Sequence, residues 1–254
     1  MRNEGLKRYF FKTKKFSKEK MVRLLSFADT KYAKTLARLE KEATAFQEFT
    51  HIKMCTEKDL DKSFLEKHGD FIAKNPRGYG YWIWKTQILL QELAEMEDGE
   101  IVVYLDAGCS LNKYGKSRYR QYLDMVINSP SGILGFQMPH QPEKYWTKGS
   151  VFKHMATPKE DKESGQIMGG IFILRKCANA LELIKEQCAL KENYALIDDS
   201  NCENEAGFKE HRHDQSLWSL LCKKHKVALV GEETWWPNFS QGMSFPFWAT
   251  RKKF

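Results

Sequence analysis

Short apolar runs alternate along the chain with stretches in which apolar residues recur every three or four positions. The run IVVYL at 101–105 is of strand length and lies between a turn and an acidic residue, a pattern typical of a strand buried on both faces. Similar runs predict further strands at residues 23–28, 51–55, 133–137, 169–174 and 227–230.

Helical spacing fills most of the segments between these runs. In residues 31–49, Leu36, Leu39, Ala43 and Phe46 recur on one helical face. Helices are expected at 31–49, 58–67, 81–96 and 117–127, after strand 169–174 to about 191, and at 214–225. Strands that alternate with helices predict an α/β domain with a Rossmann-like, mainly parallel twisted sheet and helices on both faces. Ligands of such sheets bind beyond the carboxyl ends of the strands.

Two long polar segments interrupt the alternation. Residues 139–163 are rich in polar and aromatic side chains and read as a loop with at most one short helix, and residues 193–213 read as a second loop. Loops of this length inside a compact domain are commonly functional. The expected organisation is a basic segment at 1–20, a catalytic domain at 21–234 and an aromatic, basic tail at 235–254.

The composition is that of one globular domain. Of the 254 residues, 42% are hydrophobic and no fixed-period repeat is present, which excludes disordered and solenoid proteins. The apolar runs are shorter than the roughly 20 residues of a membrane span, and no apolar stretch follows the N-terminal charges. We therefore expect a cytoplasmic protein. The six cysteines contain no C-x-x-C pair and are expected to be reduced and mostly buried.

The net charge of +8 is concentrated at the two ends of the chain. Residues 1–20 carry eight basic and two acidic side chains, and Arg251, Lys252 and Lys253 add three charges, so the ends hold +9 and the remainder about −1. This distribution excludes a nucleic-acid enzyme, whose basic stripe would line its cleft. It suits a peripheral contact with an anionic membrane on its inner face; a solvated tail without a partner is the alternative.

Asp106 directly follows the buried strand 101–105. A carboxylate at the carboxyl end of such a strand can bind a divalent cation or accept hydrogen bonds from ribose hydroxyls, and either contact would fix a nucleotide diphosphate. Ala107 and Gly108 are small and let a ligand approach the backbone. The alternative is a turn-forming aspartate with glycine two residues later.

The segment HRHDQS at 211–216 opens the last expected helix. Asp214 can cap this helix, or it can act as a general base on an acceptor hydroxyl or stabilise positive charge at a sugar carbon. His211 and His213 can ligate a metal, hydrogen-bond an acceptor, or lie on the surface.

The segment RGYGYWIWK at 77–85 places Arg77 and Lys85 at the entrance of a helix. Cations there can neutralise a diphosphate leaving group, and aromatic side chains such as Tyr81 can stack on a base or sugar. For Trp84 we favour a place in the core, and for Lys85 a functional role.

Candidate acceptor contacts come from three segments. Gly169 and Gly170 begin a buried strand and allow a ligand to lie against the backbone, with Gln166 nearby as a hydroxyl partner; ordinary turn formation is the alternative. In the loop 139–163, His140 and Trp146 are candidates for an acceptor wall or lid. The aromatic residues 235–247 are expected to close over a donor in the same way, with ordinary packing as the alternative in both cases.

Taken together, the blocks RGYGYWIWK, GEIVVYLDAGC, QIMGGIFILRK and EHRHDQSLWSLL resemble a family of bacterial and viral glycosyltransferases with the GT-A, nucleotide-diphospho-sugar transferase fold. The resemblance covers residues 77–232. It implies transfer of a sugar from a nucleotide-activated donor, with a UDP-hexose as the first choice and a GDP-deoxysugar as the second, to a hydroxyl of a glycan or glycolipid acceptor. Lipopolysaccharide or capsule synthesis is the implied setting.

The resemblance also implies residue roles. In related enzymes a D-x-D motif holds Mn²⁺ or Mg²⁺ on the donor diphosphate. Asp106 matches its first acidic position, but Gly108 stands at the second. The cation is then completed by another group such as His211 or by water, or is replaced by Lys85 and Arg77. The HDQ segment is similar to a late D-Q element, which places Asp214 beside the reacting carbon and Gln215 beside the donor.

Two other functions remain open. One is a catalytically inactive glycan- or nucleotide-binding protein on the same fold, because the second acidic residue is missing. The other is a sugar nucleotidyltransferase, which normally has a glycine-rich basic phosphate loop after the first strand; the sequence ADTK at 28–31 does not supply one.

Overall fold

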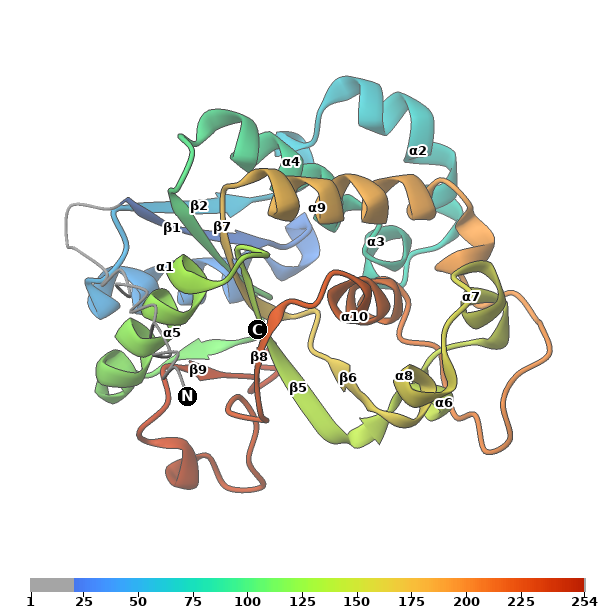
Figure 1. The fold of residues 1–254 in the computed structure, drawn as a ribbon. Helices are drawn as coiled ribbons and strands as arrows, with labels where there is room; N and C mark the ends of the chain where they lie inside the picture. Colours follow the sequence, from blue (N-terminus) through green and yellow to red (C-terminus); the bar gives the residue numbers. More distant parts are fainter. Residues whose placement is uncertain (1–20, 254) are drawn as a thin grey trace, which may run out of the picture.

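The computed structural model describes residues 21–253, and the basic segment expected at 1–20 lies outside them. Its centre is a seven-stranded sheet with the order β2-β1-β3-β7-β5-β6, to which β8 adds by pairing with β5 (Figure 1). The strands are β1 (Val22–Phe27), β2 (His51–Cys55), β3 (Ile101–Leu105), β5 (Ile133–Pro142), β6 (Gly165–Ile167), β7 (Ile171–Arg175) and β8 (Ala228–Val230).

Five of the seven strands run in one direction, which confirms the mainly parallel sheet expected from the sequence. Strands β2 and β3 are parallel to β1, and β8 is parallel to β5, whereas β7 is antiparallel to β3 and β5, and β6 is antiparallel to β5. The reversed β7 begins where β3 ends, since Ile171 pairs with Leu105. Residues just before β7 therefore lie beside residues just after β3.

Helices cover both faces of the sheet, as expected. Strand residues at odd positions of β3, such as Val103, pack with α1 (Ala33–Phe46) and α5 (Lys116–Asn128). Residues at even positions, such as Tyr104, point to the opposite face because side chains alternate along a strand. The helices on that face are α2 (Lys62–Lys74), α4 (Trp84–Glu95), α9 (Ala178–Lys191) and α10 (Asp214–Lys224).

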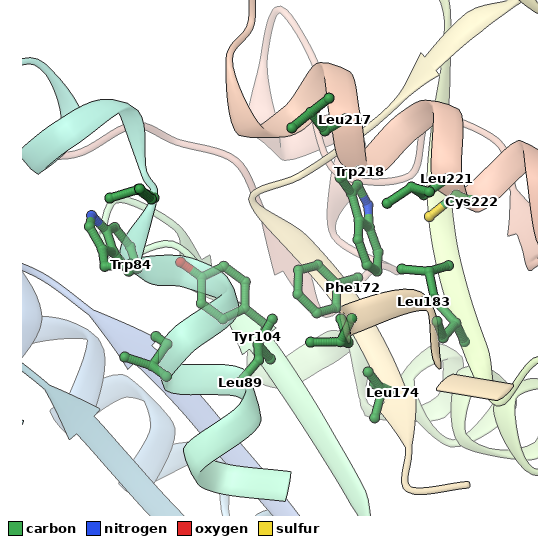
Figure 2. Close-up of a cluster of buried hydrophobic side chains, with 14 of the residues drawn as sticks. Trp84, Leu89, Tyr104, Phe172, Leu174, Leu183, Leu217, Trp218, Leu221 and Cys222 are labelled. Atoms are coloured by element: carbon green, nitrogen blue, oxygen red, sulfur yellow. The ribbon is translucent and has the colours of Figure 1, made fainter. Parts of the chain in front are cut away.

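The second face contains the larger aromatic core. Tyr104 stacks on Phe172 with ring centroids 5.0 Å apart, and Phe172 contacts Trp218 of α10 at 4.3 Å (Figure 2). Trp84 is buried here, as the sequence predicted, and stacks on Phe27 at 3.8 Å. This core fixes the start of α4 and the start of α10 against the carboxyl end of β3.

Several expected boundaries were wrong. Residues 139–163 are mostly ordered secondary structure: β5 continues to Pro142, and three short helices follow, α6 (Glu143–Trp146), α7 (Gly149–His154) and α8 (Lys159–Glu163). Pro142 and Pro158 stand at the N-caps of α6 and α8, where proline can precede a helix but would break its interior. Each helix is too short to produce a readable hydrophobic period.

The helix expected at 81–96 begins only at Trp84. A separate turn, α3 (Gly78–Tyr81), precedes it, and positive φ angles at Tyr79, Tyr81 and Trp82 of 53°, 53° and 60° break the helical path. Such angles are costly for non-glycine residues, and hydrophobic periodicity does not reveal them. Helix α2, expected at 58–67, also extends further, to Lys74.

The C-terminal segment packs on the domain. Its strand β9 (Phe247–Trp248) pairs with β4 (Ser110–Leu111), and Phe247 is fully buried beside Tyr119 and Tyr122. The remaining elements are the 3₁₀ turns η1 (Thr30–Tyr32), η2 (Glu57–Asp59), η3 (Lys113–Gly115), η4 (Tyr194–Leu196) and η5 (Phe239–Gly242).

The helix lengths and the cysteines bear on two further expectations from the sequence. The helices within residues 21–253 are all too short or too polar to cross a membrane. The six cysteines are unpaired, and three of them, Cys55, Cys109 and Cys222, are buried.

Candidate active site

Lys85 joins two carboxylates at the carboxyl end of β3. Its Nζ lies 3.2 Å from Oδ1 of Asp106 and 3.1 Å from Oδ2 of Asp214, and it donates to the carbonyl of Gly169 at 2.9 Å. The ammonium group thus has three acceptors for its three protons. The first turn of α4, the end of β3, the residues before β7 and the start of α10 meet at this point.

The β3–β7 register sets the position of Asp106. The backbone N–H of Asp106 donates to the carbonyl of Gly170 at 2.8 Å, and the Tyr104 hydroxyl donates to Asp106 Oδ1 at 2.7 Å. A Cβ on Gly170 would lie only 2.6 Å from Asp106 Oδ2. A side chain at position 170 would therefore displace the Asp106 carboxylate from its contacts with Tyr104 and Lys85.

Burial distinguishes the two carboxylates. The side chain of Asp106 is 40% exposed, whereas that of Asp214 is 6% exposed. Burial by itself lowers the pKa of Lys85, but the negative charges of Asp106 and Asp214 outweigh it, so the pKa is raised and the lysine stays charged. Asp106 is thus the carboxylate that a ligand can touch, and Asp214 is a buried counter-ion.

A second buried lysine lies close to this cluster. Lys191 donates from Nζ to the carbonyl of Trp82 at 3.1 Å. Burial lowers its pKa to about 8, with the charge of Lys85 acting in the same direction and that of Asp214 opposing it. Lys191 is the last residue of α9, where a lysine ordinarily extends into solvent, so the sequence offers no signal for its place beside the site.

The expected N-cap role of Asp214 was wrong. The residue before α10 is His213, with φ 52° and ψ −122°, and no side chain caps the helix. The Asp214 carboxylate binds Lys85 instead, and its backbone carbonyl accepts from Gln187 Nε2 at 3.1 Å.

His213 is held in one orientation with one free nitrogen. Its ring stacks on Tyr81 at 4.6 Å and on Trp82 at 5.6 Å, and Nδ1 donates to the carbonyl of Ile197 at 2.7 Å. Burial lowers the pKa of His213, so the ring is neutral and Nε2 carries a lone pair. Within the described part of the chain Nε2 is buried without a hydrogen-bond partner, 3.8 Å from Asp199 Oδ1.

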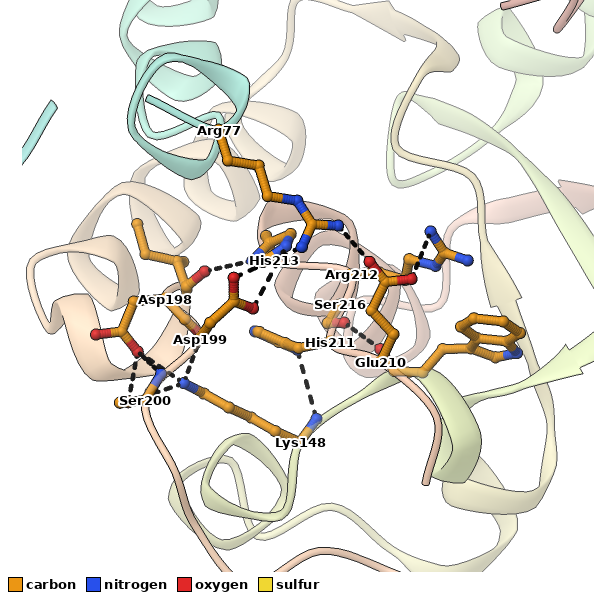
Figure 3. A network of polar contacts seen from close by, with 12 residues as sticks. Arg77, Lys148, Asp198, Asp199, Ser200, Glu210, His211, Arg212, His213 and Ser216 are labelled. Carbon is orange, nitrogen blue, oxygen red and sulfur yellow. Dashed lines mark hydrogen bonds and ion pairs between the residues drawn. The ribbon is translucent and has the colours of Figure 1, made fainter. Parts of the chain in front are cut away.

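His211 is buried, and both of its ring nitrogens are hydrogen-bonded within the protein (Figure 3). One ring nitrogen, Nε2, donates to the Leu196 carbonyl at 2.9 Å, and the other, Nδ1, accepts from the N–H of Lys148 at 3.4 Å. Burial lowers the pKa of His211 to about 3. Both nitrogens are occupied, so the expectation that His211 completes a metal site is wrong for this arrangement.

The divalent cation that the resemblance implies has no suitable ligand set here. Asp106 Oδ1 is occupied by Tyr104 and Lys85, and position 108 offers no side chain. Among residues 21–253, no three His, Cys, Asp or Glu side chains are grouped to hold a metal ion. The residues present at this edge of the sheet therefore do not fit a metal centre.

Arg77 does not join the Lys85 cluster. Its guanidinium binds Glu210 and lies 3.5 Å from Asp199, on the side of the site shown in Figure 3. Tyr81 reaches the same Asp199 carboxylate. The structure thus separates the two cations that the sequence placed together: Lys85 lies in the buried cluster, and Arg77 in a more exposed polar network.

Gln166 and Gln215 form a chain of hydrogen bonds that ends at Gly169, beside Lys85. Gln166 is fully buried; its Nε2 donates to Glu143 and Thr147, and its Oε1 accepts from Gln215 Nε2 at 2.8 Å. Gln215 Oε1 in turn accepts from the N–H of Gly169 at 3.1 Å. Gln166, expected to bind an acceptor, thus has its amide used within the protein, and Gly169 presents its carbonyl to Lys85.

Trp146 and His140, the two residues expected from the loop 139–163, each lie near a side chain of another segment. The Trp146 ring lies 4.3 Å from the guanidinium carbon of Arg212. His140 is exposed, with its ring 6.4 Å from that of Trp235, so the segments 139–163 and 235–247 come close together at this point. The backbone after Asp106 is tied down, since the carbonyl of Ala107 accepts from Arg38 at 2.7 Å.

Comparisons with known proteins give the fold. No protein-family model and no curated protein matches the chain in sequence. A solved glycosyltransferase involved in the glycosylation of the major capsid of PBCV-1 matches with a TM-score of 0.50 and 13% identity, over 89% of this chain and 91% of that one. This likeness confirms the α/β fold of the GT-A type.

Two further solved structures match with lower scores. Galactosyltransferase LgtC, in complex with donor and acceptor sugar analogs, has a TM-score of 0.46 and 14% identity over 88% of this chain and 78% of that one. Mouse xyloside xylosyltransferase 1 has a TM-score of 0.45 and 10% identity over 87% of this chain and 76% of that one.

Proposed function

We propose that this protein is a glycosyltransferase that moves a sugar from a nucleotide-activated donor to a hydroxyl of a glycan acceptor. The observation that carries the proposal is the contact of Lys85 with Asp106 and Asp214. These residues come from three blocks that are far apart in the sequence, RGYGYWIWK, YLDAGC and HRHDQS. They meet at the carboxyl end of a buried strand, where ligands of such sheets bind.

The reaction requires little covalent chemistry from the protein. The bond between the sugar carbon and the diphosphate breaks, the acceptor oxygen bonds to that carbon, and the acceptor proton leaves to a base. The sugar becomes positively charged in the transition state and the diphosphate gains negative charge. Fixed charges aimed at these changes are the main source of rate in such sites.

The two carboxylates suit different parts of this task. Asp106 is accessible, and its side chain is suited to contact the ribose or diphosphate of the donor. Asp214 places negative charge in a buried wall of the site, where it supports positive charge on the sugar carbon. Because Asp214 is 6% exposed and bound to Lys85, electrostatic support fits it better than proton transfer.

The acceptor side is assigned to the residues around Trp146 and His213. The Trp146 face offers an apolar surface for a sugar ring, whereas the Nε2 of His213 is a hydrogen-bond acceptor that is buried in this structure. His140 and Trp235 are assigned to the same acceptor side. The donor, a UDP-hexose or as second choice a GDP-deoxysugar, and the acceptor, a surface glycan or glycolipid of lipopolysaccharide or capsule synthesis, rest on the sequence resemblance. A cytoplasmic, membrane-peripheral place of action rests on the short apolar runs and the basic ends of the chain.

The proposal is tested by incubating the protein with UDP-, GDP-, CMP- and dTDP-sugars and candidate glycan acceptors, with mass detection of the product. Asp106→Asn and Asp214→Asn should each lower turnover by about a hundredfold or more. Asp70→Asn, on the surface of α2, is the matched control and should act as wild type. Nucleotide binding without transfer or donor hydrolysis by any donor would favour the inactive binding protein instead.

A further inference from the structure

The C-terminal segment crosses the end of β3, directly beside Asp106. The backbone N–H of Lys252 donates to the carbonyl of Gly108 at 3.0 Å, and the Thr250 hydroxyl donates to the same carbonyl at 3.0 Å. The Thr250 hydroxyl also lies 3.0 Å from that of Ser110. The segment 249–253 is therefore fastened across the predicted ligand edge of the sheet.

Gly108 has a structural reason to be glycine. A Cβ at this position would lie 3.3 Å from Arg251 Cα and 3.4 Å from the Lys252 carbonyl oxygen, which is tighter than ordinary van der Waals contact. The backbone of the C-terminal segment thus occupies the space into which a side chain at 108 would extend. A carboxylate side chain at 108 would press on this segment. The close packing at Gly108 therefore leaves no metal ligand at this position and places basic residues beside it.

The side chains of this segment point to different places. Lys253 Nζ lies 5.9 Å from the ring of Tyr32, just after β1. The guanidinium of Arg251 is near that of Arg212: burial is the largest cause of the lowered pKa of Arg212, and the charge of Arg251 adds to it against the opposite pull of Glu210. Lys252 lines a separate groove of about 310 Å³ with Glu42 and Trp248.

Arg251 and Lys253 bring uncompensated positive charge to the segment that crosses the end of β3. Within residues 21–253 no carboxylate forms an ion pair with either side chain, and both are exposed. Lys253 lies beside Tyr32, which follows β1, and the charge of Arg251 acts on Arg212. Unpaired cations beside the ligand edge of a sheet favour an anion with several acceptor oxygens.

We propose that Arg251 and Lys253 bind the diphosphate of the nucleotide-sugar donor and neutralise the nucleoside diphosphate as it leaves. The inference rests on the proposed function and deepens it. When the bond from the sugar carbon to the diphosphate oxygen breaks, its electron pair stays on that oxygen, and the two cations balance the added charge. The acceptor oxygen bonds to the sugar carbon, and its proton passes to solvent or a carboxylate.

The experiment compares Arg251→Gln, Lys253→Gln and the double variant with Lys252→Gln, the matched control on the same segment. Affinities for UDP and GDP are measured by calorimetry in EDTA and with Mn²⁺. Removal of each charge-assisted hydrogen bond should weaken binding by about tenfold to a hundredfold, and the double variant should also bind with a smaller dependence on salt. Lys252→Gln should bind as wild type, and melting curves check that all variants are folded.

Two results would overturn the inference: a double variant that binds both nucleotides as tightly as wild type, or wild-type binding that EDTA abolishes and Mn²⁺ restores. Binding is read without turnover, so the two proposals separate. A wild-type protein that binds through these cations but transfers no sugar removes the proposed function alone.

Discussion

Replacement of Lys85 by methionine tests the architecture of the site most directly. The Lys85 side chain is 6% exposed, and its ammonium group contacts Gly169, Asp106 and Asp214 at 2.9, 3.2 and 3.1 Å. Lys85→Met keeps the approximate length of the side chain and removes its charge. Asp106 retains contact with solvent, but Asp214 is left buried without its cation.

The expected destabilisation follows from these distances. At an effective dielectric constant of about 20, two unit charges roughly 3 Å apart attract by about 5 kcal/mol. Much of this attraction offsets the desolvation of the ions, and removal of one partner of a buried pair typically costs about 3–5 kcal/mol. We expect Lys85→Met to lower the free energy of unfolding by an amount in this range, a large part of the roughly 5–15 kcal/mol that stabilises a domain.

Urea denaturation of wild type, Lys85→Met, Asp214→Asn and the double variant measures this coupling. The double variant should be destabilised by less than the sum of the two single variants, by about 1–3 kcal/mol, because neither ion is then left alone. Lys62→Met, at a 92% exposed side chain, is the control and should unfold as wild type. Strictly additive effects, or a destabilisation by Lys85→Met no greater than by Lys62→Met, would refute the reasoning.

Two further predictions concern the surroundings of the cluster. His211 has a folded pKa of about 3, below its usual 6.5, so the unfolded chain binds the extra proton, and its contribution to stability is complete above pH 6.5 and falls by about 1.4 kcal/mol per unit as the pH drops toward 3. His211→Gln should flatten this slope in denaturation at several pH values; an unchanged slope would contradict the assignment. Gly170→Ala should destabilise the protein by about 1–3 kcal/mol and lower turnover, since its Cβ would lie 2.6 Å from Asp106 Oδ2, whereas Gly231→Ala, with no atom within 4 Å, should do neither. Equal effects of the two substitutions would show that Gly170 is not required by Asp106.

The sequence determined the elements whose signal is local. The apolar runs at 101–105 and 169–174 and the helical spacing of Leu36, Leu39 and Ala43 record which side chains face the core, so strands, helices and the two-faced α/β fold could be predicted. Asp106 and Asp214 could be singled out because each follows or opens a strongly patterned element. Lys85 could be singled out by its place in an unusual aromatic segment.

Tertiary structure decided how those elements meet. Hydrophobic pattern does not encode strand direction, so the reversal of β7, which sets Gly170 beside Asp106, was not predictable. The three helices within 139–163 were missed because short helices show no period. The positive φ angles at residues 79–82 were missed because they depend on packing against His213 and the core rather than on local propensity.

The same limit applies to the charges of the site. The sequence shows that residues 251–253 are basic, but only the folded chain places them across Gly108. The sequence also shows the cations Arg77 and Lys85 close together in the chain. In the folded protein Arg77 binds Glu210, whereas Lys85 binds two aspartates. Ion pairs depend on distances between residues remote in sequence. These distances are fixed by the packing of the whole core, so no local pattern could have specified them.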